Sequence, residues 1–255
     1  MSINIPDQAK EYGFVIDGLG AHSGRTIMLK DIRRLFAACP PGSTKDEYER
    51  AIQDDNVLLK KTGAARRESF SRLKRLYGLD EGIDLFRILR KIWVQEFEAQ
   101  PLLLMLYAVA RDPILRATVD LVNQTEQGEV LNSKDFEVEV SDQFGSELKE
   151  STLASIGRNI ASSWTQSGHF EGRSEKVRKL ASGFPVTTVW ALLLAYFCKQ
   201  RGKLLFDSPW VGLLDLKKNE LHLQAQIASK QGWLDYRKVA NVTEIKFDHL
   251  LEDGK

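Results

Sequence analysis

Apolar residues along most of this chain recur every three or four positions, with polar residues between them. That spacing is typical of amphipathic helices with one buried face. Alternation of apolar and polar residues is clearest near the C-terminus, where residues 233–236 and 242–247 are expected to form a hairpin around Ala240 and Asn241. Outside a two-helix unit at residues 44–77, helices are expected at 27–38, 81–97, 101–111, 114–123, 151–167, 186–201 and 209–216. The pattern predicts a mainly α protein, a helical bundle.

Residues 44–77 are expected to form two helices joined by a short turn. Thr44 followed by Glu47 is a capping-box start for the first helix. Thr62 is placed to cap the second helix, which is expected to end at Gly78 because glycine readily takes the left-handed conformation that closes a helix. Two consecutive helices, the second of them basic, resemble a helix-turn-helix unit that places side chains in the DNA major groove.

The second helix of this unit is strongly basic. Between residues 60 and 75 there are seven Lys/Arg and one acid, Glu68, a net charge of +6 in a chain whose total is +1. A charge run is usually a solvated helix face. Here the charge has one sign and few paired acids, which favours contact with the phosphates of a nucleic acid.

A second basic stretch follows the helix predicted at 151–167, which Gly168 is expected to end. Its basic residues are Arg173, Lys176, Arg178 and Lys179. A helix, a glycine and a basic connection are how many winged-helix units enter their wing, and a related succession precedes the C-terminal hairpin. We therefore expect a winged-helix-like α+β region with a small β-hairpin at the C-terminal end, and the two successions suggest an internal duplication.

An acidic segment separates the two basic regions. Residues 126–150 contain eight acids and two lysines, a net charge of −6. We therefore expect an N-terminal helical domain at residues 1–127, an acidic boundary at 128–148 and a C-terminal winged-helix-like domain at 149–255. A short strand within the boundary is also compatible with the alternating residues Phe136, Val138 and Val140.

The composition excludes several classes of protein. An apolar content of 43% is ample for a folded core. Cys39 and Cys198 have no neighbouring Cys or His at metal-ligand spacing, so we expect neither a metal nor a cofactor. The apolar runs at 102–110 and 189–198 are shorter than the ~20 residues that span a bilayer, and the N-terminus has no apolar signal core. These features predict a protein of the reducing cytoplasm that does not enter membranes.

A glycine-rich loop, Gly18 to Gly24, follows an apolar stretch and precedes a helix. The succession resembles a phosphate-binding loop, but a Walker loop has Lys and then Ser or Thr after its last glycine, where this chain has Arg25 and Thr26. No parallel α/β pattern follows it. Phosphate binding and a flexible entry loop capped by Thr26 therefore both stay open.

Two passages of the chain resemble the BrxA proteins of bacteriophage-exclusion (BREX) defence islands. One is residues 56–62, which lead into Arg66, Arg67 and a basic amphipathic helix; the other is a helix that opens at 151–153 and ends at 167–170. The resemblance implies a helical, NusB-like, DNA-binding accessory protein without catalytic residues, acting beside a methyltransferase and other defence proteins. By position, it implies a basic surface at Lys60, Lys61, Arg66 and Arg67. The C-terminal extension from about Gly183 and the glycine-rich entry loop depart from that family, so a separate, similar defence family is also compatible.

The first hypothesis for function is therefore a non-enzymatic component of a bacterial phage-defence system that binds double-stranded DNA mainly through its backbone. Arg66 or Ser69 would lie nearer the bases if the helix enters the groove by its N-terminal end. The expected DNA-binding residues are Lys60, Lys61, Arg66, Arg67, Arg72, Lys74, Arg75, Arg158, Arg173, Lys176, Arg178 and Lys179.

Two other hypotheses compete with DNA binding. The chain is an adaptor or scaffold in a defence or restriction-modification complex if residues 126–150 and the aromatic helices dock a partner and the basic face is only solvated. It is a nuclease if Asp54 and Asp55 act with Lys60 and Lys61, although adjacent aspartates at a helix end are usually a cap. Charge geometry separates the first two, because DNA binding requires the two basic segments to form one continuous patch.

Overall fold

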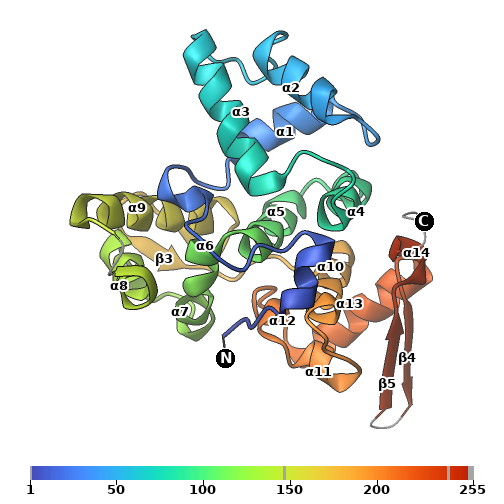
Figure 1. Cartoon of the computed structure of the whole chain (residues 1–255). Helices are drawn as coiled ribbons and strands as arrows, with labels where there is room; N and C mark the ends of the chain where they lie inside the picture. Colours follow the sequence, from blue (N-terminus) through green and yellow to red (C-terminus); the bar gives the residue numbers. More distant parts are fainter. Residues whose placement is uncertain (1, 146–147, 240–241, 252–255) are drawn as a thin grey trace.

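The computed structural model describes residues 2–145, 148–239 and 242–251, and it is mainly helical (Figure 1). Two short 3₁₀ turns, η1 (Asp7–Tyr12) and η2 (Ala21–Ser23), precede the first helix. The helices are α1 (Leu29–Ala38), α2 (Lys45–Gln53), α3 (Gly63–Tyr77), α4 (Asp84–Trp93), α5 (Gln100–Arg111), α6 (Pro113–Ala117), α7 (Val119–Gln124), α8 (Ser133–Phe144), α9 (Glu150–Gln166), α10 (Pro185–Phe197), α11 (Lys203–Phe206), α12 (Pro209–Gly212), α13 (Lys218–Lys230) and α14 (Asp248–Leu251).

The two-helix unit predicted at residues 44–77 is confirmed as α2 and α3, which lie with α1 at one end of the molecule (Figure 1). The capping box of α2 is present: the Glu47 amide donates to the Thr44 hydroxyl, and the Thr44 amide donates to the Glu47 carboxylate at 2.7 Å. Thr62 caps α3 by accepting the Ala65 amide at 3.1 Å. Local capping chemistry therefore sets both helix starts.

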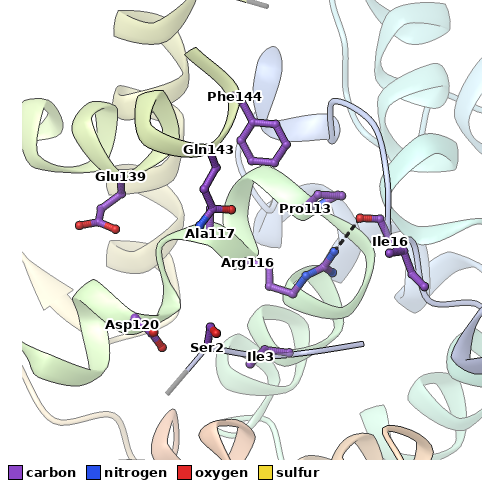
Figure 2. A pocket seen from close by; sticks show the side chains of 10 residues that line it. All are labelled: Ser2, Ile3, Ile16, Pro113, Arg116, Ala117, Asp120, Glu139, Gln143 and Phe144. Atoms are coloured by element: carbon purple, nitrogen blue, oxygen red, sulfur yellow. Dashed lines mark hydrogen bonds between the residues drawn. The ribbon is translucent and has the colours of Figure 1, made fainter. Parts of the chain in front are cut away.

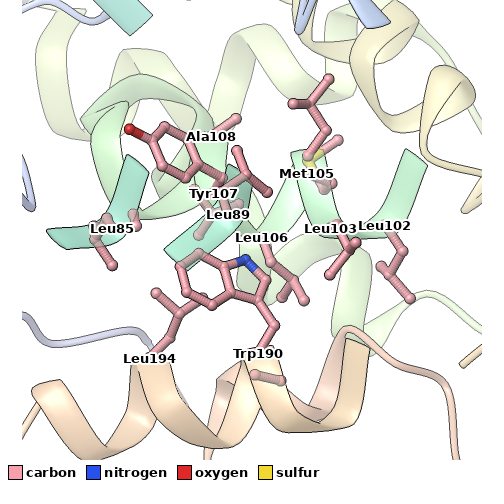
Figure 3. Close-up of a cluster of buried hydrophobic side chains, with 14 of the residues drawn as sticks. Leu85, Leu89, Leu102, Leu103, Met105, Leu106, Tyr107, Ala108, Trp190 and Leu194 are labelled. Carbon is pink, nitrogen blue, oxygen red and sulfur yellow. The ribbon is translucent and has the colours of Figure 1, made fainter. Parts of the chain in front are cut away.

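The centre of the core is α5, whose residues from 102 to 110 are all buried. Figure 3 shows its side chains packed between those of α4 and α10, with the Trp190 indole of α10 facing the Tyr107 ring. The Tyr107 ring also stacks on Tyr77 of α3, at 5.5 Å between ring centroids. One hydrophobic core thus joins helices on both sides of the predicted domain boundary. In the three described ranges no helix is both long enough and apolar enough to cross a membrane.

Several predicted helices are shorter than the sequence pattern suggested or are divided. Those expected at 186–201 and 209–216 end at Phe197 and Gly212, and two others differ as follows. The helix expected at 81–97 ends at Trp93, and Phe97, counted in its apolar stripe, is 60% exposed, with its ring 4.2 Å from the Arg33 guanidinium carbon. The helix expected at 114–123 is divided into α6 and α7 at Thr118, whose hydroxyl accepts the indole N–H of Trp164 at 3.0 Å. A tertiary contact lies close to the helix end in both cases.

The acidic boundary segment contains a helix, α8, and the strand considered for Phe136, Val138 and Val140 is wrong. Phe136 and Val140 are buried one helical turn apart, whereas Val138 is 50% exposed. The helix packs tightly on α9, because a Cβ at Gly157 would lie 2.4 Å from the Ser133 carbonyl oxygen. The division of the chain into two domains stays a prediction.

The strands form two small antiparallel sheets. The first has the order β1 (Val130–Leu131), β3 (Lys176–Arg178), β2 (Phe170–Glu171), so the second basic stretch is a turn and a strand. The second is the hairpin of β4 (Asp235–Val239) and β5 (Val242–Lys246), with Tyr236 opposite Ile245. The predicted C-terminal hairpin is confirmed, although its first strand starts at Asp235 rather than at residue 233. Its predicted turn, Ala240 and Asn241, lies outside the described residues.

Candidate nucleic-acid interface

The solvent-facing side of α3 carries cations without acidic partners. Lys61, Arg67, Lys74 and Arg75 are exposed and Arg66 is half-buried. Among the described residues no carboxylate lies within ion-pair distance of any of these five side chains. The one acid of the helix, Glu68, instead accepts Arg25 at 3.1 Å. The positive charge of α3 therefore stays uncompensated at the surface.

Three of these cations gather at the N-terminal turn of α3. The guanidiniums of Arg66 and Arg67 curl back toward Gly63, where an added Cβ would meet them at 3.7 and 3.5 Å. Lys61 is exposed just before that turn. The amides of a first helical turn point outward and bear partial positive charge. A phosphate approaching this end of α3 would meet both the helix amides and the side-chain cations.

Lys60 is only a partial match to its predicted role. Its ammonium bonds both carboxylate oxygens of Asp31 in α1, at 2.8 and 2.9 Å, and both side chains are largely covered. Its charge is therefore neutralised within the fold. The nuclease arrangement of Asp54 and Asp55 with Lys60 is not assembled either, because Lys60 pairs with Asp31 and both aspartates are exposed at the end of α2.

The C-terminal half of α3 contacts the entry loop that the sequence marked by its glycines. The Arg72 guanidinium lies against Gly24, where a Cβ would be 2.8 Å away, and Arg75 donates to the Leu19 carbonyl. Ser69 is 7% exposed, so the expected contact from Ser69 to DNA bases is wrong. Arg72 and Arg75 hold the loop and leave only part of their donors for a ligand.

The entry loop itself encloses an internal carboxylate. The amide and ring Nδ1 of His22 lie 2.9 and 2.8 Å from the Asp112 carboxylate, and a Cβ at Gly20 would be 1.8 Å from it. Burial alone would raise the pKa of Asp112, but the His22 ring and the amides of His22 and Leu115 outweigh it and hold that pKa below its usual range. The place that a bound phosphate would take in this loop is filled by Asp112.

The Nε2 of His22 lies 2.8 Å from the Ser163 hydroxyl of α9. Asp112, His22 and Ser163 therefore form a hydrogen-bonded series in the order of a serine-hydrolase triad. All three side chains are fully buried, and the Ser163 oxygen also accepts the Ile27 amide at 3.1 Å. No cavity found among the described residues is lined by any of them. The series therefore joins the entry loop, α6 and α9. Sequence reasoning missed it because its members lie 90 and 141 residues apart.

The second predicted basic cluster divides into exposed and buried members. Arg158 and Arg173 are exposed, and Lys179 is exposed beside Glu171, 3.3 Å away. Arg178 is 2% exposed and paired with Asp215 at 2.6 Å, and Lys176 is 8% exposed. The fold encloses both Arg178 and Lys176, and the DNA contacts expected of them stay a prediction.

A single face of α9 connects the two basic regions. Arg158, Ser162 and Gln166 follow one another at four-residue spacing, which places them in a row along the helix. Arg158 and Ser162 line a cleft near Arg173, and Gln166 lines a depression of about 320 Å³ with Lys60. Ser162 and Gln166 are uncharged and Lys60 is paired with Asp31, so this row joins the two basic regions without carrying continuous positive charge.

A third hollow lies on the far side of α6, between α8 and the N-terminal segment. Figure 2 shows the Arg116 guanidinium pointing toward the Ile16 carbonyl there, and the same group donates to the carbonyls of Val15 and Val109. Burial raises the pKa of Glu139 at its rim, and Asp142 and Asp120 raise it further. At about 210 Å³ it is small, and its guanidinium serves to fasten the N-terminal segment.

Comparison with known proteins adds no relative: no protein-family model matches the chain, and no curated protein matches it significantly.

Proposed function

We propose that the protein is a non-enzymatic, duplex-DNA-binding component of a bacterial phage-defence system. The observation that carries the DNA-binding part is the set of uncompensated cations at the N-terminal end and outer face of α3: the exposed Lys61, Arg67 and Lys74 and the half-buried Arg66. Contacts of this kind go to phosphates and carry little sequence information, so binding is expected to be salt-dependent and weakly selective.

The role in phage defence rests on the resemblance to BrxA proteins, whose basic passage corresponds to residues 56–67 here. Under this proposal α2 and α3 act as the helix-turn-helix-like pair, and the β4–β5 hairpin acts as a wing. Both are helix and strand arrangements that DNA-binding units use. A methyltransferase and other defence proteins are the proposed partners, and the cytoplasm is the proposed location.

Fluorescence anisotropy on a random 30-base-pair duplex, at several salt concentrations, tests the proposal. The variant Lys61→Ala/Arg66→Ala/Arg67→Ala/Lys74→Ala removes four α3 cations. Its matched control is Lys199→Ala/Lys203→Ala/Lys217→Ala/Lys230→Ala, which removes four exposed cations far from α3. Each phosphate contact contributes about 0.9 to the slope of log affinity against log salt, so the α3 variant, which removes four cations, should lose roughly 3.6 units of slope and the control almost none. Equal losses in both variants, or no binding by the parent protein at low salt, would refute the proposal.

The adaptor role is the second candidate, and the exposed side of α8 favours it. Val138 is 50% exposed there, and Asp142 on the same helix is also exposed. A helix with an exposed apolar residue among acids suits the docking of a basic partner. Retention of a co-purifying protein by the wild type and its loss in Val138→Asp, in a protein that does not bind DNA, would support this role instead.

A further inference from the structure

The largest of the cavities described, about 670 Å³, is a cleft between α9 and the β2–β3 turn. Arg158, Ala161 and Ser162 of α9 form one wall, and Ser133 at the start of α8 adds to it. The opposite wall is the turn and the first residue of β3: Gly172, Arg173, Ser174 and Lys176. The volume is within the range of small-ligand sites.

The shape of the cleft depends on two close backbone approaches. Gly172 has φ of +100°, and a Cβ there would lie 2.2 Å from the Glu175 carbonyl oxygen, so only glycine permits this tight turn. The turn holds Arg173 and Ser174 at the mouth. On the other side, Gly157 lets α8 approach α9 closely enough to bring Ser133 to the cleft. The lining is therefore set by backbone geometry and not by mobile side chains alone.

The chemistry of the lining is cationic. The lining residues include two arginines, one lysine and three serines, and none of the described lining residues carries a carboxylate. The Arg158 guanidinium also donates to the Ser155 hydroxyl of its own helix at 3.0 Å. The two acids nearest in sequence, Glu171 of β2 and Glu175 of the turn, do not neutralise the cleft: Glu171 pairs with Lys179, and Glu175 is exposed outside the lining. A site with three cations and three hydroxyls presents more donors than one carboxylate can accept, and its charge suits a group that carries close to two negative charges.

Lys176 is the member of the set that is hardest to explain by folding alone. It is 8% exposed, yet its ammonium bonds only the Gly172 carbonyl, at 2.7 Å, and pairs with no described carboxylate. Burial lowers the pKa of Lys176. A buried cation without a counter-ion is costly, and a bound anion would remove much of that cost.

The concave shape of the cleft favours a small phosphate group over the backbone of duplex DNA as its ligand. Duplex DNA is a convex rod that meets side chains projecting from a surface, and Lys176 does not project. A terminal phosphate has three free oxygens and can enter the cleft between Arg158 and Arg173. No aromatic side chain lines the cleft, so a nucleobase would find nothing to stack on.

We propose that this cleft, lined by Arg158, Arg173 and Lys176, is a binding site for a phosphate monoester. The group is carried either by a free small molecule or by a phosphorylated DNA end, which share this chemistry. The site is separate from the proposed α3 interface and does not depend on it.

Isothermal titration calorimetry of the full chain with inorganic phosphate and ribose 5-phosphate tests the site, with dimethyl phosphate and acetate as comparison ligands. We expect saturable one-to-one binding of the first two and at least ten-fold weaker binding of the comparison ligands. Affinity should fall when the pH is lowered from 7 to 5, because a monoester loses its second charge near pH 6. Arg158→Gln and Arg173→Gln, both at exposed positions that tolerate change, should each weaken phosphate binding at least ten-fold.

Lys230→Gln is the control, because it removes one exposed cation that lies outside the cleft and pairs with no described carboxylate, and it should bind phosphate as the parent protein does. The quadruple α3 variant should also keep full phosphate binding, which separates this site from the DNA interface. Binding of a single-stranded oligonucleotide with a 5′-phosphate, compared with its 5′-hydroxyl form, shows whether the phosphate belongs to a DNA end or to a small molecule. A preference for the 5′-phosphate form that Arg173→Gln abolishes assigns the site to DNA ends. No preference assigns the site to a small molecule. The proposal is overturned if no phosphate monoester binds saturably, or if both arginine variants bind as the parent protein does.

Discussion

The His169 imidazole, buried after the end of α9, predicts a loss of stability in mild acid. Its Nε2 lies 2.9 Å from the Leu213 carbonyl and its Nδ1 lies 2.7 Å from the Ser167 hydroxyl. The ring packs edge-on against Trp164, 4.9 Å between centroids. Burial lowers the pKa of His169 to about 4, and the opposing effects of Asp215 and Arg178 modify that shift. The neutral ring therefore belongs to the folded state.

The size of the effect follows from the two pKa values. An unfolded histidine titrates near 6.5, so lowering the pH below 6.5 protonates the unfolded chain before the folded one and favours unfolding. With a folded pKa of about 4, the fold loses about 2 kcal/mol between pH 7 and pH 5 and about 3 kcal/mol by pH 4. The contribution is fully present above pH 6.5 and lost as the pH falls toward the folded value.

Urea unfolding followed by tryptophan fluorescence, at pH 7 and pH 5, measures this loss. His169→Gln is the matched variant, because its amide can still donate to the Leu213 carbonyl but does not titrate. Carboxylates elsewhere affect both proteins alike, so the parent protein should lose about 2 kcal/mol more than the variant over this pH interval. A difference below about 0.5 kcal/mol would show that His169 is not held neutral by burial.

Two further changes test the packing that positions the basic regions. Asp215→Asn should cost about 3–5 kcal/mol in chemical denaturation because it leaves the buried Arg178 guanidinium with two backbone carbonyls and no counter-ion, and Asp215→Asn/Arg178→Met should recover part of that loss; equal stability of the single and double variants would contradict this. Gly157→Ala should lower stability by about 1–3 kcal/mol because its Cβ would meet the Ser133 carbonyl, whereas Gly63→Ala, where a Cβ meets only side chains at 3.5 Å or more, should not. Thermal unfolding of both glycine variants provides the check, and similar behaviour of the two would refute the role given to Gly157.

Short-range chemistry made the two-helix unit predictable. Thr44, Glu47 and Thr62 make their capping bonds within three residues, so a local pattern contains all the information that the helix starts require. The acidic segment was harder, because three alternating residues fit both a strand and a helix over so short a length. The burial of the side chains decides for the helix, because Phe136 and Val140 face the core one helical turn apart.

Which cations stay free was not predictable, because their partners are distant in sequence. Lys60 meets Asp31 29 residues away, and Arg178 meets Asp215 37 residues away. A count of charges along the chain treats these two like Lys61 and Arg67, which stay exposed. The sequence therefore predicted that α3 has a basic face. Which of the predicted cations stay exposed depends on tertiary contacts.

The stacked rings of Tyr77, Tyr107 and Trp190 attach the C-terminal end of α3 to α5 and α10. The stack fixes the C-terminal end of the helix to the middle of the protein, with ring planes 26° and 12° apart at its two contacts. The other end, which begins at Gly63, presents Arg67 to solvent, and the half-buried Arg66 donates to the Asp54 carbonyl at 3.4 Å. A ligand that pulls on this N-terminal end would tilt or bend the helix about its attachment at Tyr77. A substitution in α10 that shifts the Trp190 ring would act through the same stack. It would change the orientation of α3, and so the position of its basic end, without contacting that end.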